Sequence, residues 1–378
     1  MKVGNCQATR CWIAAEKEYQ MEKMLRDVQD FNLNHDWEKK GLATIPVCFG
    51  VSFEKAFLNQ ASALVHIYSD GSVSVSTAAT EMGQGVNMKI RQVAARIFSI
   101  PLEKIKTEST NTTRVANASP TAASYSADLN GHAARLGCLN ILARLKAFAA
   151  QRLDTKQPDD IEIKEGIICS KGEPTDLTWN KLISESYFNR INLSAQAHYA
   201  TPGIHFHEKK NKGKPFAYHT FGAAIIETTV DCLRGTYRID SVKVVHDFSK
   251  SLNPLIDRGQ VEGGVVQGLG WMTMEEVMRN EKGYLVSGTL SSYKIPDIYS
   301  APKEIQVSFL EGSHNPLGVF NSKGIGEPPL MYGIGAYFSL LKAMKAFRSD
   351  IKIDFSAPMT PEKVLLSLYA RFTDRENM

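Results

Sequence analysis

The chain has 378 residues, of which 43% are hydrophobic and 22% are charged. This composition is that of an ordinary globular protein of two or three domains, which argues against a fibrous or largely disordered chain. The 44 basic and 40 acidic residues leave a formal net charge of +4, too small an excess to indicate nucleic-acid binding. There is no run of about 18 apolar residues to predict a membrane span, and Met1-Lys2-Val3-Gly4-Asn5 lacks the apolar core of a signal peptide. We therefore expect a cytoplasmic protein.

Periodic and alternating apolar residues predict helices and strands along the first half of the chain. The clearest hairpin signal is Asp70-Gly71, which suits the positive φ angles of a tight turn. Ser119-Pro120 resembles an N-cap followed by a first-turn proline. The expected elements are a helix over 12–33, an extended segment over 43–53, a hairpin over 63–78, a helix from about 86, a strand over 104–109 and a long helix from near 119 to 150.

The second half predicts further strands and helices. These are strands over 221–230, 236–247, 284–287 and 304–310, and helices over 260–279, 329–347 and from 360. The stretch 151–216 is polar and loop-rich, so we place the main internal boundary there. We predict an N-terminal helical lead-in (1–40), a first α+β subdomain (41–215) and a second α+β subdomain (216–378). The expected fold class is α+β, with antiparallel or mixed sheets and packed helices.

The cysteines and histidines do not predict a metal centre. The six cysteines are scattered and include no Cys-x-x-Cys pair, so we expect reduced thiols rather than zinc or cluster ligands. His205 and His207 form a His-x-His pair for which no third ligand is evident. We therefore predict no metal ligand from the protein.

Two segments contain more small and polar residues than an ordinary core needs. Glu81-Met82-Gly83-Gln84-Gly85 lies between the predicted hairpin and a helix. It forms either a tight turn or a close approach to a ligand, with the free N–H groups of the helix start available to an anion. Residues 119–131 are almost entirely small, which allows close contact either with another helix or with a flat ligand.

Two further segments lie in the second half. Five glycines occur between Gly259 and Gly270, and each costs a helix about 1 kcal/mol relative to alanine, which favours close packing or ligand contact there. Their spacing is not that of a dinucleotide-binding loop. Glu327 follows Gly324 and Gly326 and precedes two prolines. Its carboxylate is either an acid that stabilises a helix start or a general base held rigidly in a cleft.

Taken in this order, these segments resemble the xanthine dehydrogenase and aldehyde oxidase family of molybdenum hydroxylases. The resemblance is to the C-terminal part of the family's molybdopterin-binding region and covers nearly the whole chain. It is greater to xanthine dehydrogenases than to members that oxidise aldehydes or carbon monoxide. The matching segments are residues 30–32, 37–46, 58–61, 80–85, 119–131, 251–254, 259–270, 292–296 and 326–329.

The resemblance implies a role for each motif. Glu327 matches the glutamate that acts as general base at the molybdenum centre. The implied substrate contacts are Phe53, Glu54, Ala122 and Ala123, with Phe53 packing against a purine. The implied cofactor is molybdenum-pyranopterin (molybdopterin), whose own sulfur atoms hold the metal. The residues implied to bind it are Gly83, Gln84, Gly85, Ala123, Ser124, Ser126 and Gln267.

The implied reaction is the oxidative hydroxylation of hypoxanthine and xanthine to urate, with water as the oxygen source. Two departures from the family pattern qualify it. The preceding half of the molybdopterin-binding region and the 2Fe-2S and FAD domains are not found in this sequence. We therefore expect a fragment, a cloned domain or a split subunit that is inactive alone, and that joins these partners in a dimeric enzyme.

The second departure is Glu54, because purine-oxidising members commonly have threonine after the phenylalanine. An acidic side chain there favours an alternative, an aldehyde or another N-heterocycle as substrate. A further alternative is a non-catalytic domain without bound cofactor.

Overall fold

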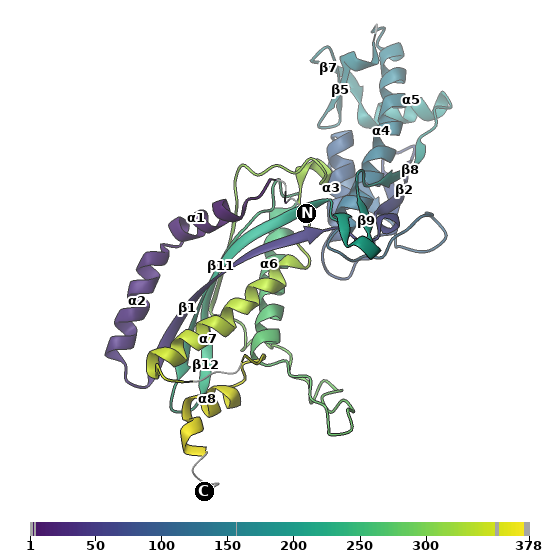
Figure 1. Ribbon diagram of the computed structural model, residues 1–378. Helices are drawn as coiled ribbons and strands as arrows, with labels where there is room; N and C mark the ends of the chain where they lie inside the picture. The colour runs from purple at the N-terminus through teal and green to yellow at the C-terminus, as the bar shows by residue number, and fades with distance from the viewer. Residues whose placement is uncertain (1–2, 4, 156, 352–354, 374–378) are drawn as a thin grey trace.

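The computed structural model describes residues 3, 5–155, 157–351 and 355–373, so at least one residue of each predicted segment, 1–40, 41–215 and 216–378, lies outside the described residues. The predicted α+β class is confirmed: sheets that are mostly antiparallel pack against helices in two groups of elements joined end to end (Figure 1). Within the described ranges, none of the helices has both the length and the apolar character needed to cross a bilayer.

The first group surrounds a four-stranded sheet in the order β1-β11-β12-β13, in which only β12 and β13 are parallel. Helices α1 and α2 cover one face, and α6 and α7 cover the other (Figure 1). The elements of this group are α1 (Ala8–Glu18), α2 (Met21–Asn34), β1 (Glu38–Val51), β11 (Tyr218–Asp231), β12 (Thr236–His246), α6 (Pro254–Thr273), β13 (Glu304–Phe309), η6 (Pro328–Gly333), α7 (Ile334–Phe347) and α8 (Pro361–Thr373).

Strand β11 shows why this sheet is covered on both sides. Its apolar residues are continuous rather than alternating, which is typical of a strand buried on both faces. Ala223 and Ile225 pack with residues of α1 and α2, whereas Ala224 and Ile226 pack with residues of α6 and α7. The sheet is therefore a rigid layer between two apolar cores.

The second group contains the sheets β4-β3-β2-β8 and β5-β6-β7 together with three helices. The long helix α4 packs against α3, β2 and β8 over one continuous core. The elements are β2 (Gln60–Ile67), β3 (Val73–Thr77), α3 (Val86–Phe98), β4 (Ile105–Thr107), α4 (Ser126–Arg152), β5 (Ile161–Lys164), β6 (Ile167–Ser170), β7 (Glu173–Thr178), α5 (Trp179–Phe188), β8 (Ser194–Ala200), and the hairpin β9 (His205–His207) and β10 (Lys212–Lys214).

Most predicted elements are present, but several differ in extent. Helix α6 begins and ends six residues earlier than the predicted helix over 260–279, and β1 begins five residues before the predicted segment over 43–53. The β2–β3 hairpin is confirmed, with Gly71 at φ 84° in its turn. The helix predicted over 12–33 is two helices, because Gln20 takes a left-handed conformation between them. The helix predicted from near 119 begins at Ser126, and the strand predicted over 284–287 is reduced to one bridge between Arg279 and Leu285.

The boundary drawn at residue 41 also differs from the structure. Strand β1 pairs antiparallel with β11 along its whole length, from Glu38 opposite Asp231 to Val51 opposite Tyr218. Residues 41–51 therefore share a sheet with the C-terminal part of the chain, and the chain enters the second group only after Val51. This long-range pairing leaves no trace in local sequence patterns.

Candidate functional site

A cavity of about 460 Å³ lies where the two groups of elements meet. Its lining comes from four parts of the chain: residues 82–89, 121–128, 252–260 and 322–327. The first three contain the starts of α3, α4 and α6, so three helix N-termini converge on one space. A helix start carries partial positive charge and unpaired N–H groups. The cavity is therefore suited to an electron-rich ligand, provided that these groups are free.

The starts of α3 and α6 are not free. The Glu81 carboxylate accepts hydrogen bonds from the N–H groups of Gly83 (3.0 Å), Gly85 (2.9 Å) and Asn87 (3.0 Å). Burial raises the pKa of Glu81, but these bonds outweigh burial and hold it below its usual value. The side chain of Asn253 similarly caps α6. The free N–H groups expected behind Gly83 and Gly85 are thus occupied, because the turn supplies its own carboxylate.

The start of α4 is free. Ala123 and Ser124 have φ angles of 57° and 54°, and Tyr125 provides no side-chain cap. No described residue accepts a hydrogen bond from the N–H groups of Ala123 and Ser124. The first N–H groups of α4 have no acceptor within the helix either. Non-glycine residues with positive φ are strained and concentrate at functional sites. This loop therefore offers unpaired donors to the cavity on either side of Tyr125, whose own N–H is bonded to the carbonyl of Ala122 at 3.3 Å.

The structure brings together much of the predicted site. These predicted residues line the cavity: Gly83, Gln84, Ala122, Ala123, Ser124, Ser126 and Glu327. The amide of Gln84 is nevertheless used within its own turn, where it accepts from the N–H of Met82 at 2.6 Å and donates to the carbonyl of Thr80 at 2.8 Å.

Other predicted residues lie outside this lining. Gly85 caps α3 and packs against Ile256, and Gln267 is exposed on α6. Phe53 is half-buried and Glu54 is exposed, just beyond the end of β1. Both residues follow Val51 closely in the chain, and Val51 lies beside Gly324 of the cavity lining.

Glu327 faces the α4 loop at the mouth of the cavity. The hydroxyl of Ser124 donates to Glu327 Oε2 at 2.8 Å and accepts a hydrogen bond from the backbone N–H of Glu327 at 2.8 Å. The Glu327 side chain is exposed, whereas its neighbours Ile325 and Pro328 are buried. A carboxylate on a buried loop is thus presented to the space above the α4 start.

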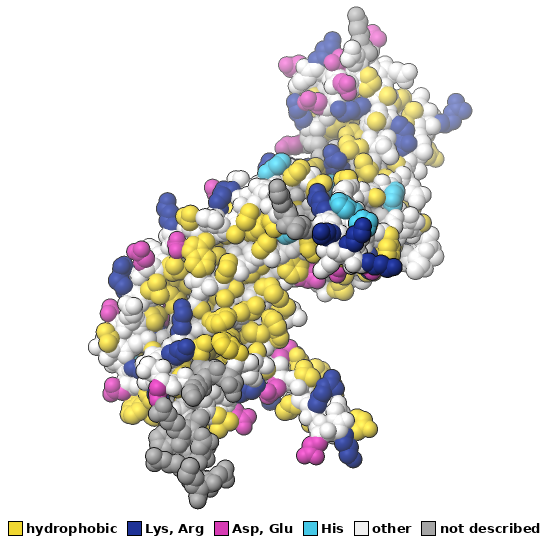
Figure 2. Space-filling model, in the orientation of Figure 1, with side chains coloured by type: hydrophobic (Ala, Val, Ile, Leu, Met, Phe, Trp, Pro, Cys, Tyr) yellow, Lys and Arg dark blue, Asp and Glu magenta, His cyan; other side chains and the backbone are white. Residues whose placement is uncertain are grey.

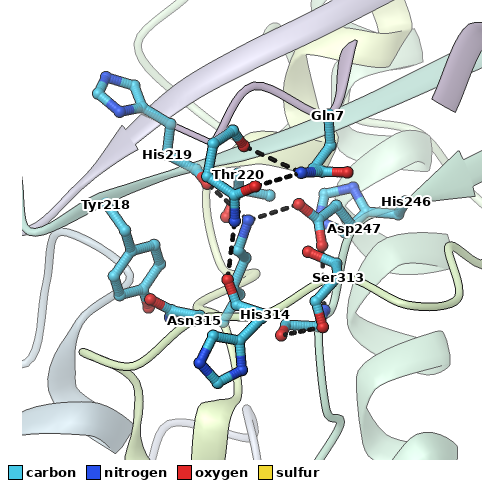
Figure 3. Close-up of polar contacts among 12 residues, drawn as sticks. Gln7, Tyr218, His219, Thr220, His246, Asp247, Ser313, His314 and Asn315 are labelled. Carbon is cyan, nitrogen blue, oxygen red and sulfur yellow. Dashed lines mark hydrogen bonds and ion pairs between the residues drawn. The ribbon is translucent and has the colours of Figure 1, made fainter. Parts of the chain in front are cut away.

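A buried ion pair anchors the loop that carries Glu327. Lys323 pairs with Asp247 and donates to the backbone carbonyl of His219 at 2.8 Å; Figure 3 labels these two partners. The two charged side chains are only 3% and 0% exposed. Removing one partner of such a pair typically costs about 3–5 kcal/mol, because the other charge stays buried. The loop is therefore fixed four residues before Glu327.

A buried carboxylate forms a second anchor. Asp128, the third residue of α4, accepts hydrogen bonds from the hydroxyl of Tyr218 and from the N–H of Val319 (2.9 Å). The Tyr218 hydroxyl in turn accepts from the N–H of Gly324 at 2.8 Å. Burial raises the pKa of Asp128 to about 6 despite these bonds. Asp128 thus ties α4, β11 and the Glu327 loop together.

Sequence reasoning missed a second buried charge pair in the cavity wall. Lys89 Nζ lies 2.6 Å from Asp257 Oδ1, and Ser251 donates to the other oxygen of Asp257 at 2.5 Å. This pair links α3 to α6. A signal was present, because Lys89 falls on the apolar stripe formed by Val86, Ile90 and Val93, where a charge requires a buried partner. Among the described residues, no group of three or more His, Cys, Asp or Glu could hold a metal ion.

A model of the molybdopterin cofactor-binding domain family matches residues 14–302. The chain therefore belongs to this family of cofactor-binding domains.

Among known proteins, the chain is 40% identical over 373 residues to a xanthine dehydrogenase/oxidase of Mus musculus and 35% identical over 380 residues to xanthine dehydrogenase 1 of Arabidopsis thaliana. These matches cover 96% and 98% of this chain but 26% of each relative. The chain thus spans about a quarter of the length of the curated relatives it matches. The resemblance to xanthine dehydrogenases within the molybdenum hydroxylases is confirmed.

Solved structures show the same fold. Quinoline 2-oxidoreductase from Pseudomonas putida 86 superposes with a TM-score of 0.81 at 21% identity, over 96% of this chain and 45% of that one. The aldehyde oxidoreductase from Desulfovibrio gigas gives a TM-score of 0.71 at 23% identity, over 93% and 36%. At these identities the likeness concerns the fold alone.

Proposed function

We propose that this chain is the C-terminal molybdopterin-binding portion of a xanthine dehydrogenase-like hydroxylase that converts hypoxanthine and xanthine to urate. The observation that carries the proposal is the contact between Glu327 and Ser124, which are 203 positions apart in the chain and meet at the mouth of one cavity. Membership of the cofactor-binding family and the identity to xanthine dehydrogenases support it.

Two features of the cavity support binding of this cofactor. Unpaired N–H groups at Ala123, Ser124 and the α4 start suit the oxygen-rich end of a flat, anionic molecule. The backbones of the Glu327 loop and the α4 loop are in close contact in the cavity lining, because a Cβ on Gly324 would lie 2.1 Å from the carbonyl oxygen of Ser124. When bound, the molybdenum cofactor supplies the metal with its sulfur ligands and accepts the two electrons of the oxidation.

We assign the cofactor-binding role to the α4 loop, with Ala123, Ser124 and Ser126. Gly83 and Gln84 line the same cavity and would contact the cofactor through the surface of their turn, because the turn itself uses its N–H groups and the Gln84 amide. Gly85 would shape that turn from outside the lining. Gln267 would contact the cofactor through a part of the site that this cavity does not include. The remaining wall would come from the preceding half of the molybdopterin-binding region. The 2Fe-2S and FAD groups would reside on other domains or subunits of a dimeric enzyme.

Glu327 performs the proton transfer. Its Oε2 atom is held by Ser124, so Oε1 is the oxygen that accepts a proton from the water-derived nucleophile. Ala122 and Ala123, being small, leave room for a planar substrate beside this carboxylate. Phe53 would add an aromatic wall at the end of β1. Glu54, beside it, supports a second candidate substrate class, an aldehyde or another N-heterocycle.

The test is Glu327→Gln in the enzyme assembled with its complementary parts. Glutamine keeps the shape and loses the basicity, so we expect kcat to fall by about 10²–10⁴-fold. Molybdenum content should not change, because the carboxylate is not a metal ligand. A fully loaded variant that retains more than about a tenth of the wild-type kcat would exclude Glu327 as general base.

A further inference from the structure

We infer that the hydroxyl of Ser124 is a positioning group for Glu327, so that Ser124 acts on the reaction through the carboxylate rather than by binding cofactor with its side chain. This inference rests on the proposed role of Glu327 as general base. The hydroxyl contacts Glu327 twice: it donates to Oε2 and accepts from the backbone N–H, both at 2.8 Å. One small group therefore fixes both ends of the glutamate.

The two hydrogen bonds restrict the Glu327 side chain although it is exposed. A free glutamate side chain samples several rotamers and loses conformational entropy when it is ordered. Here Ser124 Oγ is hydrogen-bonded both to the Glu327 amide and to Oε2, and these two bonds order the glutamate side chain before any substrate arrives. They leave Oε1 as the unoccupied oxygen. A base held in advance need not be reoriented during the reaction.

The Ser124 hydroxyl is itself aimed by the backbone around it. Ser124 and Ala123 both hold left-handed conformations, which turn the side chain toward the Glu327 loop. Gly326 permits this approach, since a Cβ there would lie 3.2 Å from Ser124 Oγ. Behind the loop, Lys323 and Gly324 are anchored in the protein interior. The backbone conformation of the α4 loop and the anchors of the Glu327 loop therefore together fix the distance between Ser124 and Glu327.

The functions of Ser124 divide between its side chain and its backbone. The hydroxyl has both a donor and an acceptor role toward Glu327, whereas the N–H has no acceptor among the described residues and lies in the cavity lining. Ser126 provides the contrast. It lines the same cavity, yet no described side chain or backbone group is hydrogen-bonded to its hydroxyl. Ser126 is therefore a matched control for loss of a hydroxyl without loss of the contact.

The first test measures hydrogen exchange of the Glu327 amide by NMR in the full 378-residue chain. Ser124→Gly removes the hydroxyl and tolerates a φ of 54° without strain, and Ser124→Ala removes it with a Cβ in place. We expect exchange to accelerate about tenfold in both variants, the effect of losing one hydrogen bond, and to be unchanged in Ser126→Ala. The Gly324 amide, bonded to Tyr218 in the same loop, should keep its rate.

Two results would overturn the inference. One is a Glu327 amide that exchanges within about twofold of wild type in both Ser124 variants. The other is equal acceleration at Gly324 and Glu327, since it would show general loosening of the loop rather than loss of a specific contact.

The second test uses the assembled enzyme and a double-mutant cycle. We expect Ser124→Gly to lower kcat about tenfold with KM within about twofold. In the Glu327→Gln background the same change should lower kcat by less than about twofold, because there is no base left to position. Equal losses in both backgrounds would contradict the positioning role. Full activity of Glu327→Gln would instead refute the proposed function, while the exchange rates would still decide whether Ser124 holds Glu327.

Discussion

Asp128 is the residue on which the two loops of the cavity converge, and its burial has a measurable consequence. Burial raises its pKa from 3.8 to about 6, although Tyr218 and Val319 donate hydrogen bonds to it. Between about pH 4 and pH 6 the folded protein therefore binds more protons than the unfolded chain. In that window this group makes the free energy of unfolding fall as the pH rises.

The variant Asp128→Asn removes this titration while it keeps the size of the side chain. We expect its free energy of unfolding, measured by urea denaturation, to rise relative to wild type by about 2–3 kcal/mol between pH 4 and pH 7. Any constant cost of altered hydrogen bonding cancels in this comparison across pH. Unfolding free energies that differ by the same amount at every pH would show that Asp128 keeps an ordinary pKa.

Glu54 is the residue that tests substrate choice. It is exposed beside the half-buried Phe53, at the end of the strand that leads to the cavity. In the assembled enzyme, Glu54→Thr should shift the ratio of kcat/KM between purines and other N-heterocycles by about tenfold toward purines, because a charge beside the ring is removed. An unchanged ratio would show that Glu54 points away from the substrate.

At the scale of elements, the glycines of α6 are explained mainly by packing. A Cβ on Gly268 would lie 2.1 Å from the carbonyl oxygen of Leu330, and a Cβ on Gly333 would lie 2.0 Å from Gly268. The backbones of α6 and η6 therefore touch, which places η6, and with it Glu327, against the helix. Gly263 differs, because nothing lies within 4 Å of the point that a Cβ would occupy there.

These two glycines give opposite expectations for the same substitution. Gly268→Ala forces the backbones apart and should destabilise the fold by about 1–3 kcal/mol. Gly263→Ala, on the same helix but with open space around it, should stabilise the fold by up to about 1 kcal/mol through helix propensity. Thermal or urea unfolding of the 378-residue chain measures both. Equal effects of the two substitutions would be incompatible with the α6–η6 contact.

Local patterns in the sequence predict most elements but not their partners. The Asp70-Gly71 turn and the apolar stripe of α3 are local signals, and both elements form as predicted. The predicted start of α4 is too early, because tertiary contacts of Ser124 and Ala123 hold left-handed backbone where Ser119-Pro120 indicates a helix. Prolines and glycines mark the Glu327 motif in the sequence, whereas its contact with Ser124 is long-range and cannot be derived from spacing.

At the scale of the whole molecule, the cavity occupies the junction of two groups of elements, and large apolar side chains remain in solvent. Figure 2 shows hydrophobic side chains over the group of elements around the β1-β11-β12-β13 sheet. It also shows them on the projecting segment between α6 and β13, called the arm below. On this arm Leu290, Ile298 and Tyr299 are 84%, 83% and 93% exposed. Exposed apolar patches are typical of protein–protein contacts. They support the proposal that further parts of the enzyme cover this chain and complete the cofactor site.

The most direct test of this view is the molybdenum content of the purified chain, determined by elemental analysis, alone and after co-expression with the preceding half of the molybdopterin-binding region. We expect the chain alone to carry little or no molybdenum, because the α4 loop and its neighbours form only one wall of the site. Co-expression should give close to one molybdenum per chain. A full complement of tightly bound molybdenum in the chain alone, or none in the assembled protein, would contradict the proposal that this cavity is one wall of a molybdopterin site.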